Sequence, residues 1–393
     1  MIRGRDFIVF SDDWGRYPFS CQHIMKRFLP DNRLLWVNTI GMRKPRINLS
    51  DIKRSIGKIR SWLTPRENKR SETNLTIISP IMIPYATIPL VRGWNRLSVI
   101  RAVRSEMRRL SFNHPIVLTT LPNASDYLNA FDEILDVYYC VDEFSEWPGV
   151  EKELVSEMEA TLLEKTDFVV AVSDELLKSK SSPYRNTFLL THGVDVNHFQ
   201  SGPELSGTDQ LMPGMNKPII GFFGLIDERT DRDLLQLIVE TRSQWSLAVI
   251  GKSVVDLTVL NKYNNFLHIN EVKYEDLPKY SSYFDACILP YKINKLTDNI
   301  NPLKLKEYLA TGKPVISTAL PEAVKLQPLV NIGTSHREII EHLDRVLACP
   351  HDCSAQIQYL QSESWDSKAD IFAKWIEEAI NKKETDYDLQ QAI

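Results

Sequence analysis

The feature that most constrains the fold is an alternation of short apolar runs with longer amphipathic segments. Apolar runs that end in turns are typical of buried parallel strands. In the first half of the chain they cover 6–11, 33–38, 74–79, 115–120, 135–140 and 167–172. Helical patterns lie between them, for example over 99–112 and 150–164. This alternation predicts an α/β fold with a doubly wound parallel sheet.

The alternation stops at a polar stretch, 202–216, which we interpret as a linker. It then restarts with apolar runs at 218–224, 246–251, 266–269, 285–290 and 314–317. We therefore predict two tandem doubly wound, Rossmann-like domains, residues 1–200 and 217–366, followed by a C-terminal helix. Ligands of open α/β sheets bind at the carboxyl ends of the strands, so the expected site is a cleft that both domains face.

Composition narrows the class of protein. The 393 residues are 43% hydrophobic and 25% charged, an ordinary globular balance. A formal net charge of −4 argues against a protein that coats nucleic acid. No stretch approaches the ~20 apolar residues that span a bilayer, and the start lacks the apolar core of a signal peptide. Five cysteines do not form a disulfide framework. We expect a cytoplasmic enzyme.

Charge is distributed unevenly along the chain. Residues 41–110 contain 16 Lys and Arg but only 4 Asp and Glu, a net charge of +12. An apolar stretch with three prolines, 77–91, lies between two basic clusters. The segment is either a solvated basic face beside a buried loop or a contact with an anionic membrane surface. The second interpretation predicts a peripheral location on the inner face of the plasma membrane. We expect no nucleic-acid partner, because no binding motif accompanies the charge.

The most informative segment of the second half is a helix start. Asn301 suits the N-cap and Pro302 the first helical position. The amides of Leu303 and Lys304 then lack intrahelical partners, and together with the lysine charge they favour phosphate binding. Glu307 lies on the same helix face and could accept hydrogen bonds from both hydroxyls of a ribose. The alternative is a well-capped core helix with solvated charges.

Further candidates follow other strands of this half. Gly224 ends the first strand, where a glycine lets a ligand approach the backbone. Arg229 and Lys252 lie in the loops beyond the first and second strands and could bind phosphate. Lys273 and Tyr274 follow the third strand, where a nucleotide base could stack, although a surface tyrosine explains the pattern equally well.

Several segments carry a family resemblance. They are Gly221-Phe-Phe-Gly-Leu-Ile-Asp227, Val272-Lys-Tyr-Glu-Asp-Leu-Pro278, Phe284-Asp-Ala-Cys-Ile-Leu-Pro290 and, above all, Asn301-Pro-Leu-Lys-Leu-Lys-Glu-Tyr-Leu-Ala-Thr-Gly-Lys-Pro-Val315. The second half resembles the nucleotide-sugar domain of GT-B glycosyltransferases, especially those of family 4. The first half is similar more loosely, at 138–143, 170–176 and 191–199. The resemblance does not cover 41–110.

This resemblance implies transfer of a sugar from a UDP- or GDP-linked donor to a hydroxyl of a glycan or lipid-linked glycan, as in cell-surface polysaccharide biosynthesis. The Glu307 position would hold the ribose, and the Lys304 region with the glycine loop the diphosphate. The resemblance implies no metal and no cofactor, and retention of anomeric configuration. The C-terminal helix, within 367–393, would pack back on the first domain.

Two positions depart from the family pattern. Asn299 stands where the family often has the first Glu of Glu-x7-Glu, which contacts the donor sugar. Leu225 stands where the family has an arginine directly after the loop glycine. We expect Arg229 or Lys252 to supply the missing cation.

The acceptor side is expected at strand ends of the first half. Asp142 and Glu143 follow the strand at 135–140 and are candidates for orienting or deprotonating an acceptor hydroxyl. Asp13 could bind acceptor hydroxyls, and Gly15 would let donor phosphates approach the backbone. Hydrogen bonding within the loops is the alternative for each of these residues.

Two rival functions remain open from sequence alone. One is a nucleotide-sugar epimerase of the same fold, which needs no acceptor. The other is a catalytically degenerate, membrane-associated scaffold, which the departures at Asn299 and Leu225 would permit.

Overall fold

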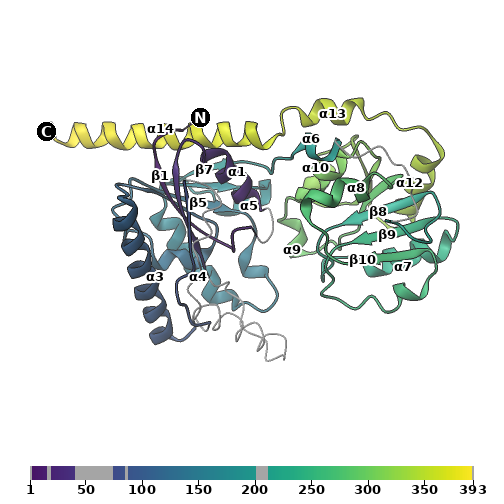
Figure 1. The fold of residues 1–393 in the computed structure, drawn as a ribbon, viewed down its shortest axis with the longest axis horizontal. Helices are drawn as coiled ribbons and strands as arrows, with labels where there is room; N and C mark the ends of the chain where they lie inside the picture. Colours follow the sequence, from purple (N-terminus) through teal and green to yellow (C-terminus); the bar gives the residue numbers. More distant parts are fainter. Residues whose placement is uncertain (1, 16–18, 40–73, 85–86, 201–210, 392–393) are drawn as a thin grey trace. The chain divides into compact units, whose positions relative to one another are not determined.

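The computed structural model describes residues 2–15, 19–39, 74–84, 87–200 and 211–391. Much of the predicted linker and the basic residues 41–73 lie outside these ranges. The chain forms two compact units, unit 1 (Met1–Leu190 with Ala369–Ile393) and unit 2 (Thr191–Lys368). Residues 191–200, which the sequence assigned to the first domain, thus belong to unit 2. Each unit contains a parallel sheet with helices (Figure 1), and the predicted fold class is confirmed.

Unit 1 contains a seven-stranded parallel sheet in the order β3-β2-β1-β4-β5-β6-β7. Its strands are β1 (Asp6–Ser11), β2 (Arg33–Asn38), β3 (Leu75–Ile78), β4 (Ile116–Thr119), β5 (Leu135–Cys140), β6 (Phe168–Ala171) and β7 (Asn186–Leu189). The first six coincide with the predicted apolar runs. β7 was not predicted, because this edge strand has no fully buried residue to mark it.

Helices cover both faces of this sheet. They are α1 (Ser20–Phe28), α3 (Pro89–Leu110), α4 (Lys152–Lys165), α5 (Asp174–Lys180) and α14 (Trp365–Gln391), with 3-10 turns η1 (Pro122–Asp126) and η2 (Phe144–Glu146). On β5, Tyr138 hydrogen-bonds to Glu159 of α4, whereas Tyr139 packs against Phe372 of α14. Adjacent strand residues point to opposite faces, so α4 and α14 lie on opposite sides of the sheet.

Unit 2 contains a six-stranded parallel sheet in the order β10-β9-β8-β11-β12-β13. Its strands are β8 (Ile219–Phe223), β9 (Ser246–Ile250), β10 (Phe266–Ile269), β11 (Ala286–Leu289), β12 (Val315–Thr318) and β13 (Val330–Gly333). Its helices are α6 (Val196–Gln200), α7 (Arg232–Thr241), α8 (Leu277–Ser281), α9 (Lys295–Asp298), α10 (Leu303–Ala310), α11 (Pro321–Val324), α12 (His336–Ala348) and α13 (Ser354–Leu360), with 3-10 turns η4 (Leu260–Lys262) and η5 (Tyr274–Asp276). Edge strand β13 was not predicted.

The strand order of each sheet reverses at one place. In unit 1 the first three strands run outwards from β1 to one edge of the sheet and the later strands run from β4 to the other edge. In unit 2 the same change of direction occurs between β8 and β11. Open α/β sheets bind ligands outside the carboxyl ends of the strands at such a switch point. In unit 2 the residues that follow β8 and β11 are therefore the first place to look for a site.

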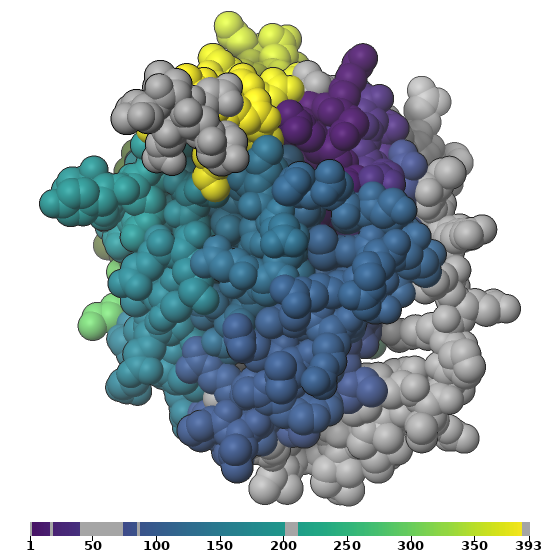
Figure 2. Space-filling model, turned by 90° about the vertical axis from the view of Figure 1, so that its left-hand side faces the viewer, coloured from purple at the N-terminus to yellow at the C-terminus, as the bar shows by residue number. Residues whose placement is uncertain are grey.

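The long helix α3 lies at the surface of unit 1. Figure 2 views unit 1 from the side of this helix, and the blue stretch that contains it forms much of the visible surface. Among the described residues, no helix combines the length and apolar character needed to cross a membrane.

We predict that the fold of unit 1 depends on the ring of Phe372. This fully buried side chain packs against three other rings, those of Phe28, Tyr139 and Phe168. Replacing it in Phe372→Ala should lower the free energy of unfolding by about 3–5 kcal/mol, because a large cavity would form. Ile371→Ala is the matched control on the same helix, since Ile371 is 41% exposed. Equal losses in urea denaturation of the two variants would contradict the prediction.

Candidate functional site

Two glycines shape the carboxyl edge of the unit 2 sheet. Gly224 directly follows β8 and has φ of +133°, and Gly251 directly follows β9 with φ of +137°. A Cβ on Gly224 would lie 1.9 Å from Cε of Lys304, and one on Gly251 would lie 2.1 Å from the carbonyl oxygen of Gly224. Both positions therefore require glycine for their conformation and for space. The absence of side chains lets the two loops and Lys304 come together.

Lys304 extends from the first turn of α10 to the switch point. Its Nζ donates a hydrogen bond to the hydroxyl of Tyr291 at 2.6 Å. The same nitrogen lies 5.1 Å from the ring centroid of Phe222 and 5.2 Å from that of Tyr291. The ammonium group is thus held by a hydrogen bond to a neutral partner and by cation–π attraction. No carboxylate of the described residues forms an ion pair with it, so its positive charge can attract an anion.

Glu307 lies one turn further along α10. Its side chain is largely buried, with 7% of the residue exposed, and no described residue donates a hydrogen bond to its carboxyl oxygens, which keep some contact with solvent. Burial raises the pKa of Glu307 to about 7, and the nearby charge of Lys304 opposes this shift. A buried polar group without a partner is unfavourable, so this carboxyl is suited to accept hydrogen bonds from a ligand.

The start of α10 differs from the prediction by one residue. Pro302 is the N-cap, the first helical residue is Leu303, and no side chain caps the helix. The interpretation of Asn301 as the N-cap was therefore wrong. Asn299 ends the short helix α9 and donates from Nδ2 to the carbonyl of Lys295 at 2.7 Å.

The two cations proposed to replace the family arginine differ in their surroundings. Arg229 donates to both carboxylate oxygens of Asp227, at 2.6–3.0 Å, and its guanidinium lies 5.5 Å from the ring centroid of Tyr291. Its charge is thus balanced within its own loop. Lys252 is half-buried beside Gly251 and forms no ion pair within the described ranges. Leu225 is 39% exposed.

The predicted base-stacking residues lie around η5. Lys273 is exposed and forms the N-cap of this turn. One face of the Tyr274 ring stacks on the His198 ring, with centroids 4.3 Å apart and an interplanar angle of 10°. The His198 Nε2 also hydrogen-bonds to the Tyr274 carbonyl at 2.9 Å. His198 therefore fixes the orientation of the Tyr274 ring.

Lys306 lies between the two α10 candidates, but no local sequence signal marks it as a functional residue. Its ammonium is buried and contacts the carboxylate of Glu363, the carbonyl of His192 and the hydroxyl of Thr191. Lys368 shares this set, with its Nζ 2.9 Å from Glu363. Burial lowers the pKa of Lys306 to about 8, while Glu363 opposes the shift. The set joins α10 to the segments where the chain enters and leaves unit 2.

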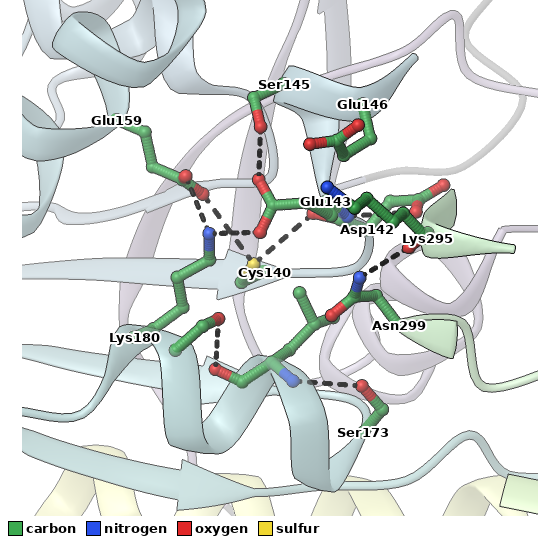
Figure 3. A network of polar contacts seen from close by, with 12 residues as sticks. Cys140, Asp142, Glu143, Ser145, Glu146, Glu159, Ser173, Lys180, Lys295 and Asn299 are labelled. Carbon is green, nitrogen blue, oxygen red and sulfur yellow. Dashed lines mark hydrogen bonds and ion pairs between the residues drawn. The ribbon is translucent and has the colours of Figure 1, made fainter. Parts of the chain in front are cut away.

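In unit 1, Asp142 and Glu143 follow β5 as predicted, and both side chains have partners (Figure 3). Asp142 accepts hydrogen bonds from the Glu143 amide at 2.9 Å and from the Trp147 indole at 2.8 Å. Glu143 accepts one from the Ser145 hydroxyl at 2.8 Å. These contacts are the loop hydrogen bonds of the alternative interpretation, and they fix the position of both carboxylates.

Glu143 also belongs to a buried ion network that the sequence did not reveal. Lys180 of α5 lies 2.7 Å from Glu143 and 2.7 Å from Glu159 of α4. The hydroxyl of Tyr138 donates to Glu159 at 2.7 Å. Burial alone would lower the pKa of Lys180, but the two carboxylates outweigh it and raise the pKa above its usual value. Figure 3 shows Lys180 between the two glutamates.

The loop after β1 carries the two remaining candidates. Gly15 is exposed, has φ of +76°, and donates its amide to Oε1 of Gln22 at 3.2 Å. Gln22 in turn donates to the carbonyl of Asp13 at 3.2 Å. Helix α1 thus holds this loop through one glutamine. Across the described ranges, no cluster of three or more His, Cys, Asp or Glu side chains is arranged to bind a metal ion.

Comparison with known proteins gives one curated relative. No family model matches the chain. TuaH of Bacillus subtilis (strain 168), whose name assigns it a glycosyltransferase step in teichuronic acid biosynthesis, is 23% identical over 184 residues. The match covers 45% of this chain and 46% of the relative, so the chain spans just under half of that protein's length.

Solved structures match over nearly the whole chain. Sucrose-phosphate synthase from Thermosynechococcus elongatus is 15% identical, with a TM-score of 0.70 over 96% of this chain and 100% of that one. Anabaena HepE in complex with UDP and glucose is 10% identical, with a TM-score of 0.68 over 95% and 100%. An Escherichia coli trehalose-6-phosphate protein bound with UDP-2-fluoro glucose is 12% identical, with a TM-score of 0.61 over 95% and 99%. The predicted GT-B architecture is confirmed at the level of fold.

We predict that Lys306 stabilises unit 2 whereas Lys304 hardly does. Lys306→Met should lower the free energy of unfolding by about 2–4 kcal/mol, because it removes one partner of a buried ion pair. This loss of unfolding free energy is smaller than it would be if Glu363 were left without any cation, because Lys368 still pairs with Glu363 in the variant. Lys304→Met, the matched control on the same helix, should cost about 1 kcal/mol, the value of one hydrogen bond. Urea denaturation of the two variants tests this order, and a reversed order would contradict it.

Proposed function

We propose that this protein is a glycosyltransferase that moves a sugar from a nucleoside-diphosphate sugar to a hydroxyl of a glycan or lipid-linked glycan. The carrying observation concerns two side chains of α10: no described residue donates a hydrogen bond to the largely buried carboxyl of Glu307, and none forms an ion pair with the ammonium of Lys304. The carboxylate needs hydrogen-bond donors and the ammonium needs an anion. A nucleoside diphosphate offers both, because vicinal ribose hydroxyls lie next to its phosphates.

The chemistry of transfer follows from the same groups. When the glycosidic bond to the diphosphate breaks, negative charge develops on the leaving phosphate. Lys304, together with the first amides of α10, would stabilise that charge, a type of electrostatic effect that is often the largest in catalysis. Gly224 would allow the phosphates to approach the backbone. We assign the cation missing at Leu225 to Lys252 rather than Arg229, because Asp227 already balances Arg229.

For the donor, we favour UDP over GDP. Two matching structures, Anabaena HepE and the Escherichia coli protein, are complexes with UDP or a UDP-sugar analogue. Tyr274, oriented by His198, and the neighbouring Lys273 are our candidates for contacts with the base. Asn299 would contact the donor sugar in place of the family glutamate. We further propose retention of anomeric configuration and no metal requirement, as the family resemblance implies.

For the acceptor, we propose a glycan of a cell-surface polysaccharide, in keeping with the name of TuaH. Asp142 and Glu143 are proposed to orient the acceptor hydroxyl, with Lys180 and Trp147 holding the two carboxylates in place. Asp13 and Gly15 lie in the loop after β1, which we propose also contacts substrate. Fixed carboxylates suit orientation, since a misplaced group loses much of its effect.

We predict that one nucleotide stabilises the protein through Glu307. A thermal-shift panel of UDP, GDP, ADP, CMP and their sugar conjugates tests this. The bound nucleotide, at about 100 times its Kd, should raise Tm by about 5–10 °C. The shift should disappear in Glu307→Gln but persist in Glu341→Gln, a control on the exposed side of α12.

The same panel separates the rival functions. A donor that is isomerised in the absence of an acceptor would indicate an epimerase. No shift with any nucleotide would overturn the proposal and favour the scaffold.

We predict that donor binding strengthens as pH rises through about 7. At a pH below the raised pKa of Glu307, its carboxyl holds a proton. At a pH above this pKa, the carboxylate can accept hydrogen bonds from both ribose hydroxyls. For a pKa near 7, the ionised fraction and hence the affinity should rise about tenfold between about pH 6 and about pH 8. Calorimetric titration with a nucleotide sugar measures this. The rise should vanish in Glu307→Gln, and an unchanged slope there would assign it to another group.

A further inference from the structure

Exposed apolar side chains concentrate on one short stretch of unit 1. Fifteen large hydrophobic residues are exposed in the described part of the chain, and six of them lie within 81–97. They are Ile81, Ile83, Ile88, Leu90, Trp94 and Leu97. Leu90 is the most exposed of the six, at 86%. Scattered single residues of this kind need no explanation, but a contiguous group marks an interaction surface.

The helical geometry of α3 places these residues on one stripe. Asn95, Val99 and Val103 form its buried stripe. Leu90, Trp94 and Leu97 recur at the same helical spacing on the opposite side. Arg101 and Arg108 continue that outward stripe towards the end of the helix, at further helical repeats. The outward stripe therefore changes from apolar to cationic along its length.

The segment before α3 adds two exposed apolar side chains next to this helix. The Asn95 side chain bonds to both backbone polar groups of Ile83, at 2.8 and 2.9 Å. The Ser98 hydroxyl donates to the carbonyl of Ile81 at 2.7 Å. These contacts fix the segment along α3 while the Ile81 and Ile83 side chains remain exposed. We call the six exposed apolar residues with Arg101 and Arg108 the α3 surface; Figure 2 views unit 1 from this side.

Charge on α3 has one sign almost throughout. The helix contains six arginines and a single acidic residue, Glu106. Arg92 is paired with Asp126, and Arg109 with Glu106. Arg101 and Arg108 are exposed and have no ion pair within the described ranges. These guanidinium groups can still bind phosphate, and arginine does so with two parallel hydrogen bonds.

We propose that the α3 surface docks the protein on a membrane that contains anionic lipids. A bilayer interface offers lipid phosphates to Arg101 and Arg108 and an acyl-chain boundary to Leu90, Trp94 and Leu97. Indole rings prefer this interface, and cations close to exposed apolar side chains suit its anionic headgroup region. An acidic protein surface would pair with the arginines, but it would offer no apolar partner to the apolar half of the stripe. The inference does not depend on sugar transfer.

The test is cosedimentation of the full chain with vesicles of phosphatidylcholine, with or without phosphatidylglycerol. The wild type should bind only the vesicles that contain phosphatidylglycerol, and high salt should weaken binding. Arg101→Gln with Arg108→Gln should reduce the affinity about tenfold or more, since each cation near an anionic surface contributes about 1 kcal/mol. Leu90→Ser with Trp94→Ser should reduce it in both low and high salt, because these residues act through burial rather than charge.

Matched controls replace exposed residues elsewhere. Tyr184→Ser removes an exposed apolar side chain of unit 1, and Arg337→Gln removes an exposed arginine of unit 2. Both should bind like the wild type, and unchanged circular dichroism of all variants would show that each folds. Absence of wild-type binding at low salt, or equal binding by the wild type and the α3 variants, would overturn the proposal. Equal binding to vesicles with and without phosphatidylglycerol would overturn the proposal that Arg101 and Arg108 bind anionic lipids.

Discussion

The contact between the Lys304 side chain and the bare backbone at Gly224 determines the arrangement of the proposed donor site. Any Cβ on Gly224 would occupy the space of the lysine stem. With the glycine, the stem passes directly over the loop and its ammonium reaches Tyr291, beyond the neighbouring strand β11. A cation is thereby placed at the switch point of the sheet, where the strand order leaves room for a ligand.

Helix α10 can present an unpaired charge because its neighbouring residues anchor it. The Tyr308 hydroxyl bonds to both backbone polar groups of Phe223, at 3.0 and 3.1 Å, which fixes α10 against the end of β8. Lys306 binds the segments around Thr191 and Glu363. Glu307 lies between these two anchors. Their contacts offset the unfavourable burial of its carboxyl and leave it in place for a ligand.

The sequence predicted strands better than polar partners, for a physical reason. Central parallel strands are buried on both faces, so β1, β2 and β5 appear as largely apolar runs. Edge strands β7 and β13 are only partly buried and carry a weaker signal. The placement of Lys304 and Glu307 on one helix could be predicted because their spacing is local. The partners of Lys306 could not, since Thr191 and Glu363 lie far away in sequence and only the fold brings them together.

The two buried lysine networks differ in their balance of charge, and this bears on what each can do. The Lys306 set has two ammonium groups and one carboxylate, so it is complete without a further cation. The Lys180 set has one ammonium group and two carboxylates. Its excess charge is negative, and Glu143 is its more exposed carboxylate, at 14%. A further hydroxyl that donates to Glu143, in addition to that of Ser145, would stabilise this negative charge. This excess of negative charge favours Glu143 over Asp142 as the group proposed to orient an acceptor hydroxyl.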